Sequence, residues 1–206
     1  MSLQFMKIDP TPLEGVLVIE PHCFRDERGF FLESFQNERY KKAGITENFV
    51  QDNHSHSNKR GILRGLHFQV KRPQAQIITV FRGCIYEAVV DLRPKSQSFG
   101  RWFGVELNDQ GPRQIYLAAG FAHGFCVLSE SADVHYKVSR AYDHDDEGGL
   151  LWNDLDIGVQ WPIDAPYLLA RDSAFPRLRD LRPDQLPHDP PIEIEAISRK
   201  SHNESN

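Results

Sequence analysis

Short runs of apolar residues recur along most of the chain, and turn-forming residues separate them. Gly, Pro, Asn, Asp and Ser fill the breaks, for example at Asp26–Gly29, Arg93–Pro94 and Asn108–Pro112. Strands of this length and spacing are typical of a β-sandwich or a β-barrel. The runs predict about ten β-strands, at Val16–Glu20, Gly29–Phe35, Phe49–Asn53, Ile62–Gln69, Gln76–Arg82, Ile85–Leu92, Arg101–Leu107, Arg113–Leu117, Gly124–Leu128 and Val134–Tyr142.

A helical pattern is confined to Glu38–Ala43, which Gly44 follows, and to part of the C-terminal third. From Leu181 onward the chain becomes polar and contains several prolines. We therefore expect a single domain over residues 1–182 and a polar, partly disordered extension over residues 183–206. Within this extension, Ile192–Ile197 is expected to form an edge element or a short helix.

The composition is that of an ordinary globular protein. Of the 206 residues, 40% are hydrophobic and 26% are charged, which is enough apolar material for a sizeable core. The net charge of −5 argues against a protein whose main task is to hold nucleic acid or an anionic membrane. It leaves room for a local basic pocket that binds one small anion. The chain contains neither a Walker loop nor a Rossmann glycine fingerprint, so NTP hydrolysis and nicotinamide chemistry are not supported.

Targeting and cysteine patterns favour a cytoplasmic protein. The first residues contain no apolar run long enough for a signal peptide, and no later run is long enough for a membrane span. The three cysteines, Cys23, Cys84 and Cys126, show no CxxC spacing. Because Cys84 and Cys126 lie in apolar segments, buried free thiols are favoured over a disulfide or a metal pair.

Three of the nine histidines stand close together, at His54, His56 and His67. The stretch that holds them has three possible interpretations: a metal site, an acid–base site with an anion clamp, or a strand that merely carries histidines. A His-x-His pair on a strand puts both imidazoles on one face, which suits a metal. The cations Lys59 and Arg60 follow shortly after, where further ligands would be needed. We therefore expect no metal here.

His67 has a different setting. Alternate residues of a strand share a face, so Leu63, Gly65, His67 and Gln69 point one way and leave space beside the imidazole. A lone strand histidine is most often structural, but a cation such as Arg64 near a potential base suggests a bound anion. Arg64 and His67 have opposite parity, so they share a pocket only if the strand contains a bulge, and Gly65 is a suitable place for it.

Three further motifs leave alternatives open. His123 lies in Gly120–Phe125, where two glycines suggest a tight backbone near a pocket. Tyr136, between Val134 and Val138, is either a core residue or a general acid that faces a polar cavity. The segment from Asp143 to Asp154 nearly fits a calcium loop but lacks the usual bidentate Glu and flanking helices, so a solvated turn is expected.

Several stretches in unbroken order, over about residues 10–180, carry a family resemblance. They are Asp26–Phe35, Val50–Ser55, Leu63–Gln69, Gly120–Phe125, Trp152–Asp154 with Trp161-Pro162, and Ala170–Asp172. Together they closely resemble the dTDP-4-dehydrorhamnose 3,5-epimerase family. The resemblance implies an all-β, cupin-type jelly roll, a double-stranded β-helix with short peripheral helices. It further implies a cytoplasmic homodimer without metal or cofactor. The substrate would be a nucleotide-linked 4-keto-6-deoxy sugar, dTDP-linked first of all, used in deoxysugar and surface-polysaccharide synthesis.

The same resemblance assigns roles to individual residues. Epimerisation next to a ketone needs a base, an acid on the opposite face of the ring and a group that stabilises the enolate oxygen. By resemblance His67 is the base, Asp172 its buried partner and Tyr136 the acid, while His123 lies in the active-site loop. The substrate-binding positions implied are Arg64 and Arg28, which clamp the diphosphate with Arg28 coming from the second subunit, together with Gln51, Asn53, Glu33, Gln76 and Tyr142.

Two positions depart from the family pattern. Gln76 stands where the family has a lysine beside the sugar ketone, so the enolate oxygen there receives a hydrogen bond but no positive charge. Ala141-Tyr142 replaces a pair of aromatic residues, which removes one stacking surface. The sequence predicts an epimerase that acts at C3, C5 or both. Three alternatives are a sugar-nucleotide 3,4-ketoisomerase, a nucleotide-sugar binding homologue with weakened catalysis, and a metal-dependent cupin oxygenase.

Overall fold

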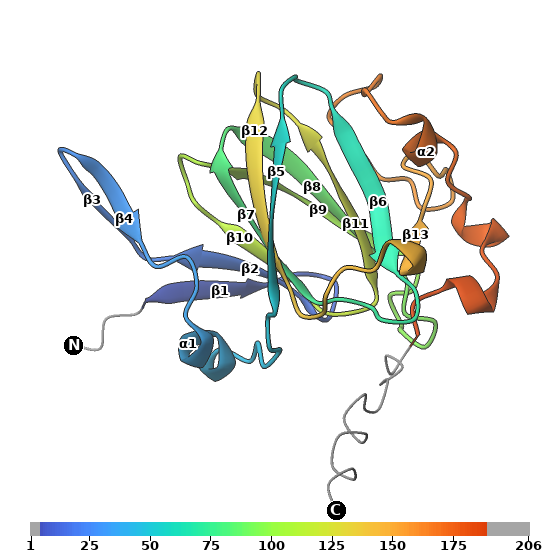
Figure 1. Cartoon of the computed structure of the whole chain (residues 1–206), viewed down its shortest axis with the longest axis horizontal. Helices are drawn as coiled ribbons and strands as arrows, with labels where there is room; N and C mark the ends of the chain where they lie inside the picture. Colours follow the sequence, from blue (N-terminus) through green and yellow to red (C-terminus); the bar gives the residue numbers. More distant parts are fainter. Residues whose placement is uncertain (1–4, 189–206) are drawn as a thin grey trace, which may run out of the picture.

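The structure, a computed structural model, describes residues 5–188. It consists of two main antiparallel β-sheets, a protruding hairpin and short helices (Figure 1). The helices are α1 (Asn37–Lys42) and α2 (Ala170–Ser173), with the 3₁₀ turns η1 (His144–Asp146), η2 (Leu178–Asp180) and η3 (Pro183–Gln185). The strands are β1 (Met6–Pro10), β2 (Val16–Pro21), β3 (Cys23–Asp26), β4 (Gly29–Leu32), β5 (Gln51–Ser57), β6 (Leu63–Gln69), β7 (Gln76–Arg82), β8 (Cys84–Asp91), β9 (Trp102–Asn108), β10 (Gln114–Leu117), β11 (Phe121–Val127), β12 (Ala132–Val138) and β13 (Glu147–Gly149).

The two sheets pack face to face around the main core. One sheet has six strands in the order β1-β2-β10-β7-β12-β5, and the other has five in the order β13-β6-β11-β8-β9. Alternate side chains of each sheet point inward, so Ile78 and Val134 of the first meet Val89 and Phe125 of the second in one buried cluster. The predicted all-β fold is confirmed.

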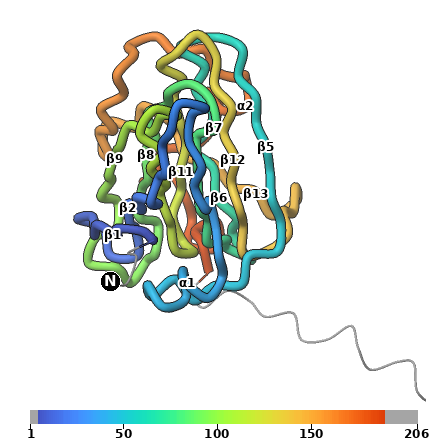
Figure 2. The backbone as a smooth tube through the Cα atoms, turned by 90° about the vertical axis from the view of Figure 1, so that its left-hand side faces the viewer, coloured from blue at the N-terminus to red at the C-terminus, as the bar shows by residue number. Residues whose placement is uncertain are grey.

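The outer face of the five-stranded sheet is covered by the chain that follows β13. A second buried cluster lies there. It joins Ala88 and Val90 of β8, and Leu92 just after β8, to Leu150 and Ile157 of the covering segment. Figure 2 shows this segment, in orange and red, along the edge and outer side of the sheet. The arrangement brings α2 next to β6, about one hundred residues earlier in the chain.

Several predicted strand limits were wrong, both at the sheet edge and next to it. The strand predicted at Phe49–Asn53 is β5, Gln51–Ser57, whose alternate residues are exposed, so it lacks a continuous apolar signal. The strand predicted at Val134–Tyr142 is β12, Ala132–Val138. Just beyond it, the hydroxyl of Ser139 accepts a hydrogen bond from the backbone N–H of Ala75. The short strands β1, β3 and β13 were not predicted.

The hairpin of β3 and β4 projects away from both sheets (Figure 1). Three of its phenylalanines are exposed, and Phe31 is the most exposed at 70%. Apolar side chains on a protruding hairpin are costly in water unless another molecule covers them. The hairpin is therefore a surface that a partner would bury.

The segment that resembles a calcium loop begins with the turn η1, whose His144 and Asp145 side chains are exposed as predicted, whereas two of its carboxylates are not solvated. Asp146 and Asp154 are buried, with 6% and 2% exposure. Asp146 accepts hydrogen bonds from the backbone N–H groups of Lys71 and Arg72, and Asp154 accepts one from Leu178. Carboxylates with these partners fix loops against one another.

At the C-terminal end of the described chain, η3 follows residue 182, and the backbone N–H of His188 donates to the carbonyl of Val70 at 2.8 Å. The element predicted at Ile192–Ile197 and the rest of the predicted extension lie outside the described residues. Among residues 5–188, no helix is both long and apolar enough to cross a membrane. The three cysteines are free, and burial raises the thiol pKa of both Cys84 and Cys126 to about 11.

Candidate active site

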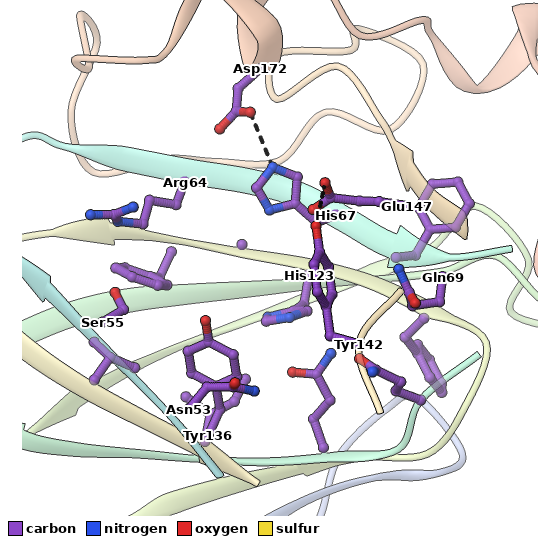
Figure 3. Close-up of a pocket in the computed structure, with 18 of the residues that line it drawn as sticks. Asn53, Ser55, Arg64, His67, Gln69, His123, Tyr136, Tyr142, Glu147 and Asp172 are labelled. Carbon is purple, nitrogen blue, oxygen red and sulfur yellow. Dashed lines mark hydrogen bonds and ion pairs between the residues drawn. The ribbon is translucent and has the colours of Figure 1, made fainter. Parts of the chain in front are cut away.

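A cavity of about 300 Å³ opens between the two sheets, and each sheet supplies one of its walls (Figure 3). The six-stranded sheet contributes Asn53, Ser55, Gln76, Ile78, Val134 and Tyr136. The five-stranded sheet contributes Arg64, His67, Gln69, Phe121, His123 and Phe125. The rim includes Tyr142, Glu147, Leu169, Arg171 and Asp172. His67 and Tyr136 therefore stand on opposite walls of the cavity.

His67 is held by a buried carboxylate from α2. Its Nε2 lies 3.1 Å from Oδ1 of Asp172, and Oδ2 of Asp172 accepts the backbone N–H of Gly65 at 3.1 Å. Burial raises the pKa of Asp172, but the hydrogen bonds from His67 and Gly65 and the nearby charge of Arg171 outweigh it, so the pKa lies below its usual value. An ionised Asp172 favours the tautomer with the proton on Nε2, which leaves an unprotonated Nδ1 facing the cavity (Figure 3).

The predicted bulge at Gly65 is confirmed. On β11, His123 pairs with His67 and Phe125 with Arg64, so β6 carries one extra residue between the two pairs. Gly65 has φ +111°, and a Cβ there would lie 2.7 Å from the carbonyl oxygen of His123. Only glycine fits this backbone, and the bulge brings Arg64 and His67 to the same cavity.

A second histidine–carboxylate pair lies on the same wall. Nδ1 of His123 is 2.7 Å from Oε1 of Glu87, whose side chain on β8 is fully buried. Burial raises the pKa of Glu87, and the adjacent His123 only partly opposes this effect. Sequence reasoning missed Glu87, although a charged residue at an inward-facing position between Ile85 and Val89 was the signal that could have found it.

Tyr136 faces the cavity from the opposite wall, with its hydroxyl pointing inward (Figure 3). Burial raises the pKa of its phenol, the charge of Arg64 opposes this and Glu147 adds to it, so the pKa is above its usual value. The phenol is therefore protonated at neutral pH and can donate a proton to a carbanion in the cavity.

Arg64 is anchored at the cavity by neutral partners. Its Nε donates to the hydroxyl of Ser57 at 3.2 Å and its Nη2 to the carbonyl of His56 at 3.1 Å. No carboxylate within residues 5–188 forms an ion pair with it, so its charge is available to an anionic ligand.

The rim contains an ionic chain that sequence reasoning did not assign. The hydroxyl of Tyr142 donates to Glu147 at 3.1 Å, and Nη1 of Arg171 donates to the same carboxylate at 2.7 Å. Nη2 of Arg171 also lies 3.5 Å from Nε2 of His67. Arg171 precedes Asp172 in the chain, so one short helix contacts His67 through both residues and also contacts Glu147 at the rim.

Three residues predicted to bind substrate do not line the cavity of their own chain. Arg28 lies on the β3–β4 hairpin with its side chain 83% exposed and paired with Asp26. Glu33 pairs with Arg39 at 2.6 Å. Gln51 lies just behind the wall, where its amide donates to Asn53 at 2.7 Å and accepts the backbone N–H of Tyr142.

The remaining predicted residues take distinct places. His54 and His56 lie on the outer face of β5, and both contact Oδ1 of Asp133 at 2.9 Å. Among residues 5–188 no group of three or more His, Cys, Asp or Glu side chains is arranged to hold a metal ion. Gln76 lines the cavity and is only 9% exposed.

Comparisons with known proteins agree on one family. The family model described as dTDP-4-dehydrorhamnose 3,5-epimerase matches residues 10–180. The dTDP-4-dehydrorhamnose 3,5-epimerase of Methanothermobacter thermautotrophicus is 44% identical over 154 residues, which cover 75% of this chain and 83% of the relative. The dTDP-4-dehydrorhamnose 3-epimerase of Streptomyces niveus is 38% identical over 169 residues, covering 81% of each chain.

A solved structure also has a similar fold. The 3,5-epimerase from Legionella pneumophila, in complex with dTDP-4-keto-L-rhamnose, superposes with a TM-score of 0.85 at 40% identity, covering 88% of this chain and 97% of that one.

Proposed function

The chain belongs to the dTDP-4-dehydrorhamnose 3,5-epimerase family, and we propose that His67, Asp172 and Tyr136 carry out its reaction. Membership confirms the resemblance found in the motifs. The protein is an isomerase, a dTDP-4-keto-6-deoxyhexose 3,5- or 3-epimerase of deoxysugar biosynthesis. The proposal concerns which residues act, which centres are inverted and how the subunits assemble.

The opposite placement of base and acid carries the proposal. The C4 ketone of the substrate acidifies the hydrogens at C3 and C5, and Nδ1 of His67 removes one of them. Asp172 stabilises the imidazolium that forms. The enolate then takes a proton on its other face from the phenol of Tyr136, which stands on the facing wall. Addition to the opposite face inverts the carbon.

The other cavity residues are proposed to bind the substrate. Arg64 holds the diphosphate, because its charge has no carboxylate partner among the described residues. Asn53, Tyr142 and His123 line the cavity where the sugar and nucleotide are expected. Gln51 acts from behind by fixing the amide of Asn53.

Isotope exchange tests the catalytic roles. We expect the enzyme to incorporate deuterium at C3, at C5 or at both when dTDP-4-keto-6-deoxyglucose is incubated in deuterated water, as NMR would show. The His67→Asn variant should lose exchange by at least about 10³-fold, since no base remains. Tyr136→Phe should lose inversion by roughly 10²-fold or more while His67 still exchanges a proton on one face. Absence of deuterium at both centres would refute the assignment.

The carbon atoms that take up deuterium, C3 alone or both C3 and C5, distinguish a 3-epimerase from a 3,5-epimerase. The relative from Streptomyces niveus carries the second name, so the family includes both activities. We propose that C3 is inverted first, because both activities include this centre. Label at C5 without label at C3 would exclude this order.

We further propose that the protein is a homodimer in which the β3–β4 hairpin of each subunit reaches the cavity of the other. The exposed phenylalanines and Arg28 of this hairpin support the proposal, since Arg28 does not line the cavity of its own chain. Glu33, just after the hairpin, would then lie near the subunit boundary.

Mixed dimers test this arrangement. Arg28→Ala and His67→Asn subunits should each be weakly active alone, whereas refolded mixtures should regain activity in about one quarter of the sites, because random pairing gives half heterodimers with one intact site each. If Arg28 serves its own subunit, mixing restores nothing.

A cytoplasmic location is proposed on the basis of the cysteines. All three are free, which suits a reducing compartment. Cell fractionation should recover the activity with cytosolic markers, and recovery with secreted proteins would contradict this location.

A further inference from the structure

Two buried polar groups of the cavity wall, the amide of Gln76 and the hydroxyl of Ser55, have an oxygen without a hydrogen-bond partner among residues 5–188, and the amide is the larger group of the two. In Gln76 this oxygen is Oε1. No described residue accepts a hydrogen bond from its nitrogen either. A buried amide in this state is expected to find its partner in a ligand.

Gln69, which lines the same cavity, differs from Gln76 because both ends of its amide are hydrogen-bonded within the protein. Its nitrogen donates to the carbonyl of Asp143 at 2.9 Å, and its oxygen accepts the backbone N–H of Asp143 at 3.0 Å. These two bonds fix which end of the Gln69 amide faces which way. Gln76 has neither, so half a turn of its amide exchanges the NH₂ group and the carbonyl oxygen without breaking any hydrogen bond within the protein.

The position of Gln76 brings it close to the reacting part of the sugar. On neighbouring strands, Tyr136 pairs with Ile78 and Val138 pairs with Gln76, so Gln76 lies two residue pairs along from Tyr136 and faces the same way. Diagonal neighbours in a sheet lie within about 8 Å of one another. In the proposed placement, with C3 or C5 of the sugar at Tyr136, the C4 oxygen points toward Gln76.

We propose that Gln76 is a specificity-determining residue that lets the cavity bind the 4-keto sugar and its 4-hydroxy counterpart with similar affinity. The NH₂ group donates to a ketone oxygen, and the turned amide accepts from a hydroxyl. The inference rests on the proposed placement of the sugar. It implies that a reductase converting the ketone of the product to an alcohol generates a competitive inhibitor of this enzyme.

Calorimetry on the full-length protein tests the proposal. His67→Asn serves as the parent, so that the ketone is not turned over during titration. The ligands are dTDP, dTDP-4-keto-6-deoxyglucose and dTDP-6-deoxyglucose, which differ in the sugar and in its C4 oxygen. The variants Gln76→Met and Gln76→Lys are built on the same parent, and binding of dTDP reports that each variant is folded.

The parent should bind the two sugars within about threefold of each other. Gln76→Met, which has similar length and no polar atom, should weaken both sugars several-fold and leave dTDP unchanged. Gln76→Lys offers donors only, so the hydroxyl proton is left without an acceptor and the affinity ratio should shift by about tenfold toward the ketone.

Two results would overturn the inference: a parent that already prefers one sugar by tenfold or more, and a Gln76→Met variant that binds both sugars as the parent does. A parent that fails to bind dTDP would instead overturn the proposed function. The two failures are therefore distinguishable.

Discussion

His67 and His123 face each other across neighbouring strands, yet their carboxylate partners come from different parts of the molecule. Glu87 lies on β8, within the same sheet as His123, and its side chain is fully buried. Asp172 lies on α2, outside both sheets, and also accepts a backbone N–H. The His123–Glu87 pair lies within one sheet, whereas the His67–Asp172 pair joins that sheet to the segment that packs against it.

The difference in partners has electrostatic consequences. Hydrogen bonds and Arg171 hold the pKa of Asp172 below its usual value despite burial, whereas burial raises the pKa of Glu87. An ionised partner stabilises a protonated imidazole, so His67 is suited to receive a proton. His123 is held in a fixed orientation at the cavity wall by its hydrogen bond with Glu87. Neighbouring histidines in equivalent strand positions can thus perform different tasks.

Of changes to the two carboxylate partners, Asp172→Asn should have the largest effect. The neutral amide of asparagine cannot stabilise the imidazolium, and its NH₂ group favours the histidine tautomer that lacks a proton on Nε2. The kcat for deuterium exchange should therefore fall by roughly 10²- to 10³-fold. Stopped-flow or NMR exchange would measure the change, with circular dichroism to confirm folding. A loss of less than tenfold would mean that the two pairs do not differ as argued.

Glu87→Gln should have a much smaller effect on activity. The carbonyl of glutamine can still accept the hydrogen bond from Nδ1 of His123, so its orientation persists and kcat should fall by less than tenfold. The same exchange assay provides the measurement. A fall as large as that of Asp172→Asn would make Glu87 part of the proton-transfer machinery.

The smallest effect is a pH dependence of opposite sign in the two variants. The raised pKa of Glu87 means that its contribution to folding is fully present below its unfolded pKa of about 4 and is lost as pH rises through the folded pKa. Glu87→Gln should therefore gain stability relative to the wild type as pH rises. Each unit of pKa difference is worth about 1.4 kcal/mol.

Asp172 has a lowered pKa, so its contribution is present above its unfolded pKa of about 4 and is lost as pH falls through the folded pKa. Asp172→Asn should therefore lose stability relative to the wild type as pH rises from strongly acidic values. Urea denaturation at a series of pH values would compare the slopes. Parallel slopes would contradict the electrostatic contrast between the pairs.

The sequence predicted the sandwich well where strands are buried on both sides, as at β7 and β8, because continuous apolar runs mark them. It failed at β5, whose exposed edge lacks such a run. Within the site, the Gly65 bulge followed from the parity of Arg64 and His67. The pairing of His67 with Asp172 followed only from family resemblance, because no local pattern connects residues 105 positions apart.

The segment that carries Asp172 is held against the sheets by apolar packing and by a small number of backbone hydrogen bonds. Tyr167 exchanges backbone hydrogen bonds with Gly61 and Leu63, and the N–H of Leu151 donates to the carbonyl of Pro176. Local opening of these contacts would remove the partner of the base while both sheets stay folded. Heat inactivation should therefore begin below the melting temperature of the sheets and be reversible on cooling. We therefore expect the upper temperature limit of activity to follow how firmly this segment is held rather than how stable the core is.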